Sequence, residues 1–294
     1  MLRIFNAQGL NIGLRYLASV GLSTGNGRYL VKDCKVLRLP DSLVKPSPID
    51  LNIKDSGRLK EIIKQFLLNS KTRMKKKIFL SLPDLSVKVS IVDLEKLPSK
   101  KKDLEKILAW KMEKVSLFPL QDVKLSYQVL HKPTKRDGGS YRLLVSMIKR
   151  DILNQYEDLI STLGLSPVIV DISSFHIFNL YNDHISKKVP HDKGFIFLNI
   201  FENFTLMIFK DGLLDYIRIK ASGGGITKTF DDLTTSLNIY SEGRDLSALT
   251  NLFVFGDNPS EELVKLAEKE LGLIAESLGT KMVSSVEGIT SIID

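Results

Sequence analysis

The sequence predicts an α/β protein built from two similar lobes, with a small subdomain inserted into the first. A run of short apolar strands separated by turns occupies the first 40 residues, and a comparable run recurs over 195–219. Each run is followed by helical periodicity and then by a further strand, which is the order expected of a duplicated α/β unit. Residues 84–165 have no counterpart in the second half, so we expect them to form the insertion.

The first lobe is assigned to 1–83 and 166–190. Alternating or continuous apolar runs bounded by Gly, Asn or Pro indicate strands, and apolar positions at i, i+3 and i+4 indicate helices. The predicted elements are strands at 2–5, 16–22, 28–39, 78–82 and 168–172 and helices at 57–69 and 174–187.

The insertion, 84–165, is predicted to combine three strands with two helices. Its first helix carries the apolar stripe Leu104, Leu108 and Met112, and Phe118-Pro119 ends it. Trp110 falls on the opposite side of this helix, where it either packs against a neighbouring strand or anchors a partner. The predicted elements are strands at 87–92, 125–130 and 142–148 and helices at 104–115 and 152–163.

The second lobe is assigned to 191–294 and is short. Only about one helix fits between Gly225 and the strand that ends at Phe255. Apolar residues from Leu263 to Leu278 keep helical spacing and predict one long final helix. The predicted elements are strands at 195–200, 204–209, 213–219 and 252–255 and helices at 226–240 and 263–278.

Composition limits the function classes. The 294 residues are 43% hydrophobic and carry a net charge of +8, which suits nucleic acid, anionic lipid or an acidic protein as partner. A single cysteine, Cys34, supports neither a disulfide framework nor a thiolate metal site and fits a reducing cytoplasm. The four histidines are scattered, so we expect no metal site. No apolar run approaches the ~18 residues of a membrane span.

A short motif occurs once in each lobe, as Leu10-Asn11-Ile12-Gly13 and Leu198-Asn199-Ile200-Phe201. Each copy adjoins a strand, a turn and a second strand. Actin-like ATPases hold phosphates with such an element once per lobe, using Asp-x-Gly, and this chain resembles them. Both copies have Asn in place of Asp, and Phe201 stands where a glycine is expected. The resemblance implies a two-lobed actin-like (ribonuclease-H-like) fold with a 1C-like insertion and a reduced second lobe.

The order of further motifs resembles the PilM-type type IV pilus assembly proteins, relatives of the cell-division protein FtsA and of the cytoplasmic domain of type II secretion L proteins. The matching segments run in order over nearly the whole chain. They are Leu82-Pro83, Glu113-Lys114, Ser116-Leu117-Phe118-Pro119-Leu120, Asp122-Val123, Tyr127-Gln128-Val129-Leu130, Leu163-Gly164-Leu165-Ser166-Pro167 and Gly223-Gly224-Gly225.

The resemblance implies a vestigial nucleotide site whose parts depart from the family pattern. Phe201 blocks the close backbone approach that glycine allows, and Glu202 places a negative charge beside a triphosphate. Asparagine offers Mg²⁺ only a neutral amide oxygen. We therefore expect no catalytic residue and no resident cofactor, although residual ATP and Mg²⁺ binding through the glycines stays open. The candidate nucleotide residues are Asn11, Gly13, Asn199, Gly223, Gly224, Gly225 and Gly256.

The expected function is a non-catalytic cytoplasmic scaffold of a type IV pilus or related secretion machine, held peripherally at the inner membrane. The resemblance implies that the cytoplasmic N-terminal segment of a PilN-like inner-membrane protein docks between the first lobe and the insertion, near Trp110, Phe118 and Pro119. A pilus or secretion motor complex and the anionic membrane are further expected partners. The alternative is a nucleotide-binding actin-like ATPase that switches assembly. A nucleic-acid partner is disfavoured, because the lysines are not interleaved with aromatic residues.

Overall fold

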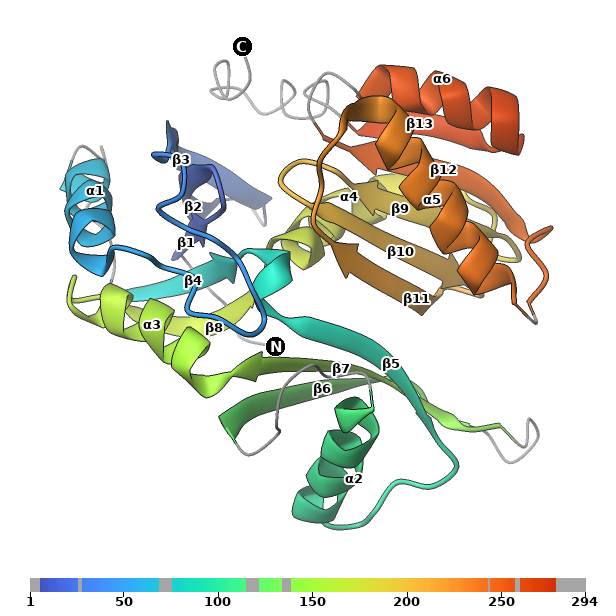
Figure 1. The fold of residues 1–294 in the computed structure, drawn as a ribbon, viewed down its shortest axis with the longest axis horizontal. Coiled ribbons are helices and arrows are strands. Elements are labelled where there is room, and N and C mark those ends of the chain that lie inside the picture. The colour runs from blue at the N-terminus through green and yellow to red at the C-terminus, as the bar shows by residue number, and fades with distance from the viewer. Residues whose placement is uncertain are drawn as a thin grey trace. The chain divides into compact units, whose positions relative to one another are not determined.

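The computed structural model describes residues 6–25, 28–68, 76–114, 122–133, 139–242, 244–256 and 260–278. These residues form two five-stranded sheets, one three-stranded sheet and the helices that cover them (Figure 1). Among the helices of this described part, no segment combines the length and the apolar character needed to cross a bilayer.

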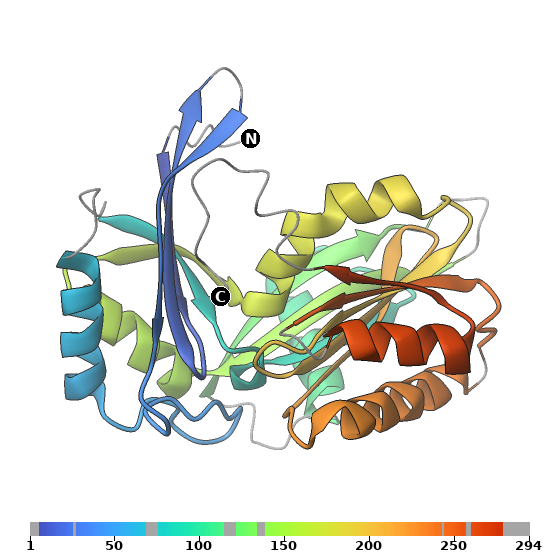
Figure 2. The same ribbon diagram turned by 90° about the horizontal axis from the view of Figure 1, so that it is seen from above.

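The first five-stranded sheet has an antiparallel meander at one side and parallel strands at the other. In spatial order its strands are β3 (Arg28–Arg38), β2 (Tyr16–Gly25), β1 (Asn6–Ile12), β4 (Lys77–Leu82) and β8 (Ser166–Ile172). Strand β4 runs parallel to β1 and to β8. Helices α1 (Ser56–Leu68) and α3 (Arg150–Ser161) lie on the same face of this sheet (Figure 2).

The second five-stranded sheet repeats this topology strand for strand. In the same spatial order its strands are β11 (Leu213–Lys220), β10 (Phe204–Lys210), β9 (Gly194–Asn199), β12 (Leu249–Phe255) and β13 (Ile274–Leu278). The meander is antiparallel, and β12 runs parallel to β9 and to β13. The identical order confirms the predicted duplication.

Helices cover both faces of the second sheet. Helices α5 (Gly225–Ser241) and α6 (Ser260–Leu271) lie on one face and α4 (Ser173–Lys188) on the other (Figures 1 and 2). Side chains alternate between faces along a strand, so Ile196 and Leu198 join the core under α5 and α6, whereas Phe195 and Phe197 contact Phe178 of α4. Strand β9 is buried on both faces, as its continuous apolar sequence predicts.

The insertion forms a three-stranded antiparallel sheet covered by one helix. Its strands, in spatial order, are β5 (Lys88–Leu94), β7 (Tyr141–Lys149) and β6 (Val123–His131). Helix α2 (Lys101–Glu113) packs Leu104, Leu108 and Met112 against them, which is the predicted stripe. The short helix η1 (Asp84–Ser86) precedes β5.

The chain divides into two compact units. One contains the first sheet with α1, η1, α3 and the part of α4 that ends at Ile177. The other contains the inserted sheet with α2, the rest of α4 and the second sheet with its helices. Within this second unit, β11 lies beside β5. The lobe boundaries inferred from the sequence stay predictions.

The structure corrects two expectations. The apolar stripe from Leu263 to Leu278 is not one helix, because α6 ends at Leu271 and Ile274–Leu278 forms β13. Gly272 causes the break: it adopts φ +66°, a left-handed conformation that ends helices, while its N–H still donates to the Glu268 carbonyl. The predicted strand at 2–5 lies outside the described residues. The first described strand is β1, which contains Asn11 and lies where the sequence pattern predicted no strand.

Candidate functional site

The candidate nucleotide residues fall into the two units, with Asn11 and Gly13 in one and the remaining five in the other. In each unit they lie at one end of the strands of the five-stranded sheet. In the first unit, Asn11 is paired with Ser81 of β4, and Ser81 is paired with Asp171 of β8. Helix α4 begins at this end of the strands, at Ser173.

The side-chain oxygen of Asn11 accepts a hydrogen bond from within the protein. The Ser173 hydroxyl donates a hydrogen bond to Asn11 Oδ1 at 2.8 Å, and the Ser81 hydroxyl lies 3.1 Å from the Ser173 hydroxyl. The N–H of Gly13 donates to the Tyr16 carbonyl at 2.9 Å, which closes the turn between β1 and β2. Both residues therefore have structural roles at the end of the sheet.

A buried carboxylate holds the same end of α4. Asp84 is fully buried, and its side chain accepts hydrogen bonds from the Ser174 backbone N–H at 3.0 Å and from the Ser174 hydroxyl. A carboxylate at a helix N-terminus satisfies an unpaired N–H and complements the helix dipole. Sequence reasoning missed this contact, because 90 residues separate the partners.

One ionisable group at this end of the strands has a shifted pKa. Burial raises the pKa of Asp171 above its ordinary value, against the opposing effects of the Ile172 N–H and of His176. The Asp171 and His176 side chains are 4.0 Å apart. Throughout the part of the chain that the structure describes, no group of three or more His, Cys, Asp or Glu residues is arranged to hold a metal ion.

In the second unit, Asn199 takes the role of a turn residue. It is the last residue of β9 and is 2% exposed. Its Oδ1 accepts the backbone N–H of Phe201 at 3.0 Å, the hydrogen bond that makes asparagine favourable in turns. The Phe201 ring lies 6.1 Å from the Phe255 ring, so the residue that replaces the expected glycine packs toward β12.

Gly256 is covered by the residue that follows Asn199. The N–H of Ile200 donates to the Phe255 carbonyl at 2.8 Å, and an ideal Cβ built on Gly256 would lie 2.4 Å from Ile200 Cγ1. The lack of a side chain at Gly256 therefore makes room for Ile200, which also packs against the core of the second sheet.

The glycine run Gly223-Gly224-Gly225 lies at the same end of the strands as Asn199. Lys220, the last residue of β11, pairs with Phe204, and Thr205 pairs with Asn199. Gly224 and Gly225 have φ of +102° and +79°, values that side chains rarely adopt, and α5 begins at Gly225. The run is exposed, and the first turn of α5 carries no acidic residue.

The candidate partner-binding residues are only partly within the described chain. Phe118 and Pro119 lie outside it. Trp110 is 57% exposed on α2, and Lys114 Nζ lies 4.5 Å from the centroid of its ring. This exposure does not fit the expectation that Trp110 packs against a strand.

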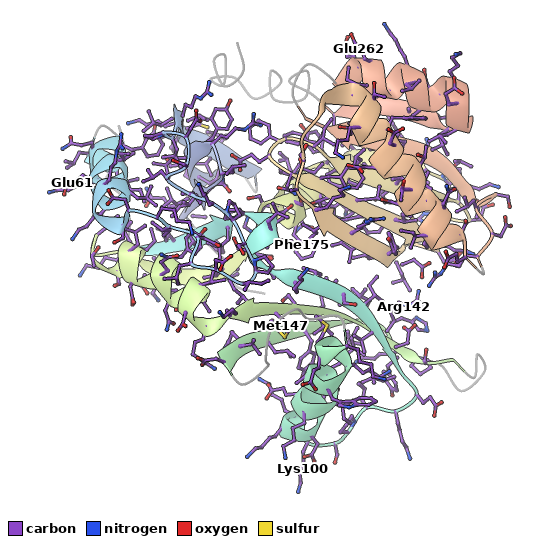
Figure 3. All side chains as sticks on the ribbon, viewed as in Figure 1. Glu61, Lys100, Arg142, Met147, Phe175 and Glu262 are labelled. Atoms are coloured by element: carbon purple, nitrogen blue, oxygen red, sulfur yellow. The ribbon has the colours of Figure 1, made fainter. Side chains whose placement is uncertain are left out.

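Sequence reasoning also missed a charged network between the inserted sheet and the second sheet. The guanidinium of Arg142 on β7 bonds to Asp93 on β5 at 3.0 Å and to Asp215 on β11 (Figure 3). The Tyr240 hydroxyl donates to Asp215 at 2.7 Å. Burial and the neighbouring Asp215 raise the pKa of Tyr240 above its ordinary value. Scattered single charges in a sequence give no signal for such a network.

Comparison with known proteins gives one family. Residues 9–242 match the family model described as type IV pilus assembly protein PilM. A solved PilM–PilN type IV pilus biogenesis complex matches with a TM-score of 0.77 and 20% identity, over 95% of this chain and 89% of that chain. No curated protein sequence matches significantly.

Two further solved structures are similar to this chain. A Bacteroides thetaiotaomicron protein with an actin-like ATPase fold and unknown function matches with a TM-score of 0.59 and 9% identity, over 97% of this chain and 98% of that chain. The cytoplasmic domain of EpsL, an inner membrane component of the type II secretion system of Vibrio cholerae, gives 0.47 and 12%, over 85% and 81%. The first of these confirms the predicted actin-like fold.

Proposed function

The chain belongs to the PilM family of type IV pilus assembly proteins, and we propose that it acts as a non-catalytic scaffold in the assembly platform of a type IV pilus or a related secretion machine. In this role it works on the cytoplasmic side of the inner membrane, where it is held peripherally and contacts the motor complex. Its task is to bind a membrane partner and present it to the rest of the machine.

The proposal that the scaffold is non-catalytic rests on the hydrogen bonds that both asparagine side chains accept within the fold. Asn11 Oδ1 accepts the Ser173 hydroxyl, and Asn199 Oδ1 accepts the Phe201 N–H. Phosphoryl transfer needs a carboxylate that organises Mg²⁺ and a backbone cradle for the phosphates. Here the amides are neutral and engaged, and Ile200 covers Gly256.

For the membrane partner we propose the cytoplasmic N-terminal segment of a PilN-like inner-membrane protein. The support is the solved relative, which is a complex of PilM with PilN. A short extended tail can bind a folded domain by pairing with a sheet edge or by filling an apolar groove. Calorimetry with a synthetic peptide of that tail tests the proposal, and micromolar or tighter binding is expected.

A second candidate function is a nucleotide-dependent assembly switch. The exposed Gly224 and Gly225 at the start of α5 favour it, because the N-terminus of a helix attracts anions and no acidic side chain occupies the first turn. In this reading the nucleotide binds without a carboxylate to organise its metal ion.

A thermal-shift titration with Mg-ATP and Mg-ADP separates the two functions. A ligand that binds only the folded state at ~100 times its Kd adds about 2.7 kcal/mol to the free energy of unfolding. We expect no shift at millimolar nucleotide. A clear rise in Tm that is lost on Gly224→Ala would refute the non-catalytic scaffold in favour of the switch.

A further inference from the structure

Among the described residues, the outward face of α2 is an exposed surface with an unusual composition. Leu104, Leu108 and Met112 bury the inner side of the helix against the inserted sheet. On the opposite side Trp110 is 57% exposed and Ile107 is 37% exposed. Tryptophan is highly buried on average in folded proteins, so an exposed one on a well-packed helix calls for a function.

Basic residues line the helix on both sides of this tryptophan. Lys102, Lys106, Trp110 and Lys114 follow one another at intervals of four residues and are all exposed, which places them in one row along the helix. We call this row, together with Ile107, the α2 row. The segment 100–114 contains six lysines and three acidic residues, a net charge of +3. Asp103 and Glu113 lie on the same exposed side, about 20° and about 60° around the helix axis from Trp110, so this side carries the three lysines of the row and two acidic residues.

We propose that the α2 row lies on the surface of an anionic lipid bilayer, with Trp110 and Ile107 among the headgroups and the lysines above the phosphates. Tryptophan prefers the interface between water and hydrocarbon, and each lysine near an anionic leaflet adds attraction. The proposal deepens the proposed function, on which it rests, because it assigns the membrane contact of the scaffold to one helix.

An exposed aromatic and an exposed aliphatic side chain next to lysines suit the surface of an anionic bilayer. The four positions span twelve residues of helix, or roughly 18 Å at about 1.5 Å per residue. Successive positions of the row turn by about 40° around the helix axis, so Lys106, Trp110 and Lys114 can face one flat surface together, while Lys102 lies to one side. The alkyl parts of the lysines can lie along the interface while their ammonium groups stay in water.

The chain supplies its own probe, because Trp110 is its single tryptophan. The experiment titrates the full chain with vesicles of phosphatidylcholine containing 30 mole per cent phosphatidylglycerol, about one anionic lipid in three, as a mimic of an anionic leaflet. Vesicles of phosphatidylcholine alone are the comparison. We expect a blue shift of Trp110 emission and its quenching by lipids brominated in the upper acyl chain, with the anionic vesicles alone.

Charge reversals then test the lysines. Taking about fivefold in affinity per lysine, Lys106→Glu with Lys114→Glu should weaken co-sedimentation with the anionic vesicles by roughly 25-fold or more. Trp110→Ala should weaken it roughly tenfold. The matched control is Lys265→Glu with Lys269→Glu, which makes the same change in net charge on exposed positions of α6. It should change binding by less than about threefold.

Three outcomes would overturn the proposal. Vesicle binding without any change in Trp110 emission would place the membrane contact elsewhere. An equal loss of binding in the α6 control would show that binding depends on the net charge of the protein and not on the α2 row. A blue shift produced by the PilN-like tail peptide in the absence of lipid would make the row a protein contact. Calorimetry of the variant Lys106→Glu with Lys114→Glu and the tail peptide separates this proposal from the proposed scaffold function, since tail binding should be retained.

Discussion

Asp215 on β11 and Arg142 on β7 form an ion pair between residues 73 positions apart in the chain. The Asp215 side chain is 9% exposed, so the pair is largely withdrawn from water. Because the two strands belong to different sheets, the pair ties the inserted sheet to the second sheet. The hydroxyl of Tyr240 on α5 donates a hydrogen bond to the same carboxylate, and Arg244 Nε lies 3.8 Å from it.

Removing the guanidinium should be costly. We expect Arg142→Met to lower the free energy of unfolding by about 2–3 kcal/mol, because the largely buried Asp215 carboxylate loses its nearer charged partner and keeps only the more distant Arg244 at 3.8 Å. Urea denaturation followed by circular dichroism measures this change. The control is Arg150→Met, whose 3.9 Å pair with Asp122 is exposed and should contribute less than about 0.5 kcal/mol. Equal effects of the two variants would contradict the structural role of the Asp215 pair.

The buried cap of α4 gives a second prediction. Asp84→Ala should destabilise the protein by about 2–4 kcal/mol, since the Ser174 N–H and hydroxyl lose a charged acceptor in a buried site. Ser174→Ala keeps the backbone hydrogen bond and should cost about 1 kcal/mol. Thermal unfolding compares the two. If Ser174→Ala proved the more damaging change, the carboxylate would not be the cap.

The pH dependence of one ion pair can also be predicted. Burial acts to raise the pKa of Glu276, but hydrogen bonds from Lys188 at 2.6 Å and His184 at 2.9 Å prevail, so this pKa lies below its ordinary value of 4.5. A depressed carboxyl pKa contributes stability above the unfolded-state value and loses it as pH falls through the folded-state value.

Glu276→Gln should therefore be less stable than the natural chain at pH 7, by less than about 1 kcal/mol because the groups are partly exposed. The difference should shrink below about pH 4.5, as Glu276 takes up its proton in the natural chain. Urea denaturation at pH 7, 5 and 4 measures it. A difference that grows on acidification would reverse the sign and exclude the predicted linkage.

The contact between Gly256 and Ile200 gives a fourth prediction. Gly256→Ala places a methyl group 2.4 Å from Ile200 Cγ1 and should destabilise the protein by about 1–3 kcal/mol. Ile200→Ala in the same chain should recover part of the loss, which a double-mutant cycle detects. Gly223→Ala is the control, because a Cβ there meets no heavy atom within 4 Å. Additive effects at Gly256 and Ile200 would show that the two do not compete for space.

Local patterns were sufficient to predict most of the fold. Period-two and period-3.6 apolar spacing located the second meander, strands β2 and β3 of the first and the stripe of α2, since burial on one face acts over a few residues, but it missed β1. The pattern failed where two elements shared one spacing. Apolar residues continue at helical intervals past Leu271, and only the left-handed Gly272 shows that a helix gives way to a strand. A single glycine inside an apolar stripe is a weak signal.

The candidate site was predictable in position and not in contacts. The two copies of the motif lie at the ends of β1 and β9, and the positive φ of Gly224 and Gly225 explains why these two positions are glycine. The acceptor role of Asn11 toward Ser173 joins residues 162 positions apart, and no periodicity encodes such a contact. Distant polar pairs depend on the tertiary fold, so they become visible only after the strands are placed.

The register of the inserted sheet explains how an extra module was tolerated. Lys88, at the start of β5, pairs with Met147 near the end of β7, so the chain enters and leaves the module through adjacent antiparallel strands. An insertion with neighbouring ends imposes on its host little more geometric constraint than a tight loop would. In the second sheet the equivalent connection from β12 to β13 holds only α6. The three strands and one helix of the module therefore add a surface between β4 and α3 while the two five-stranded sheets keep the same strand order.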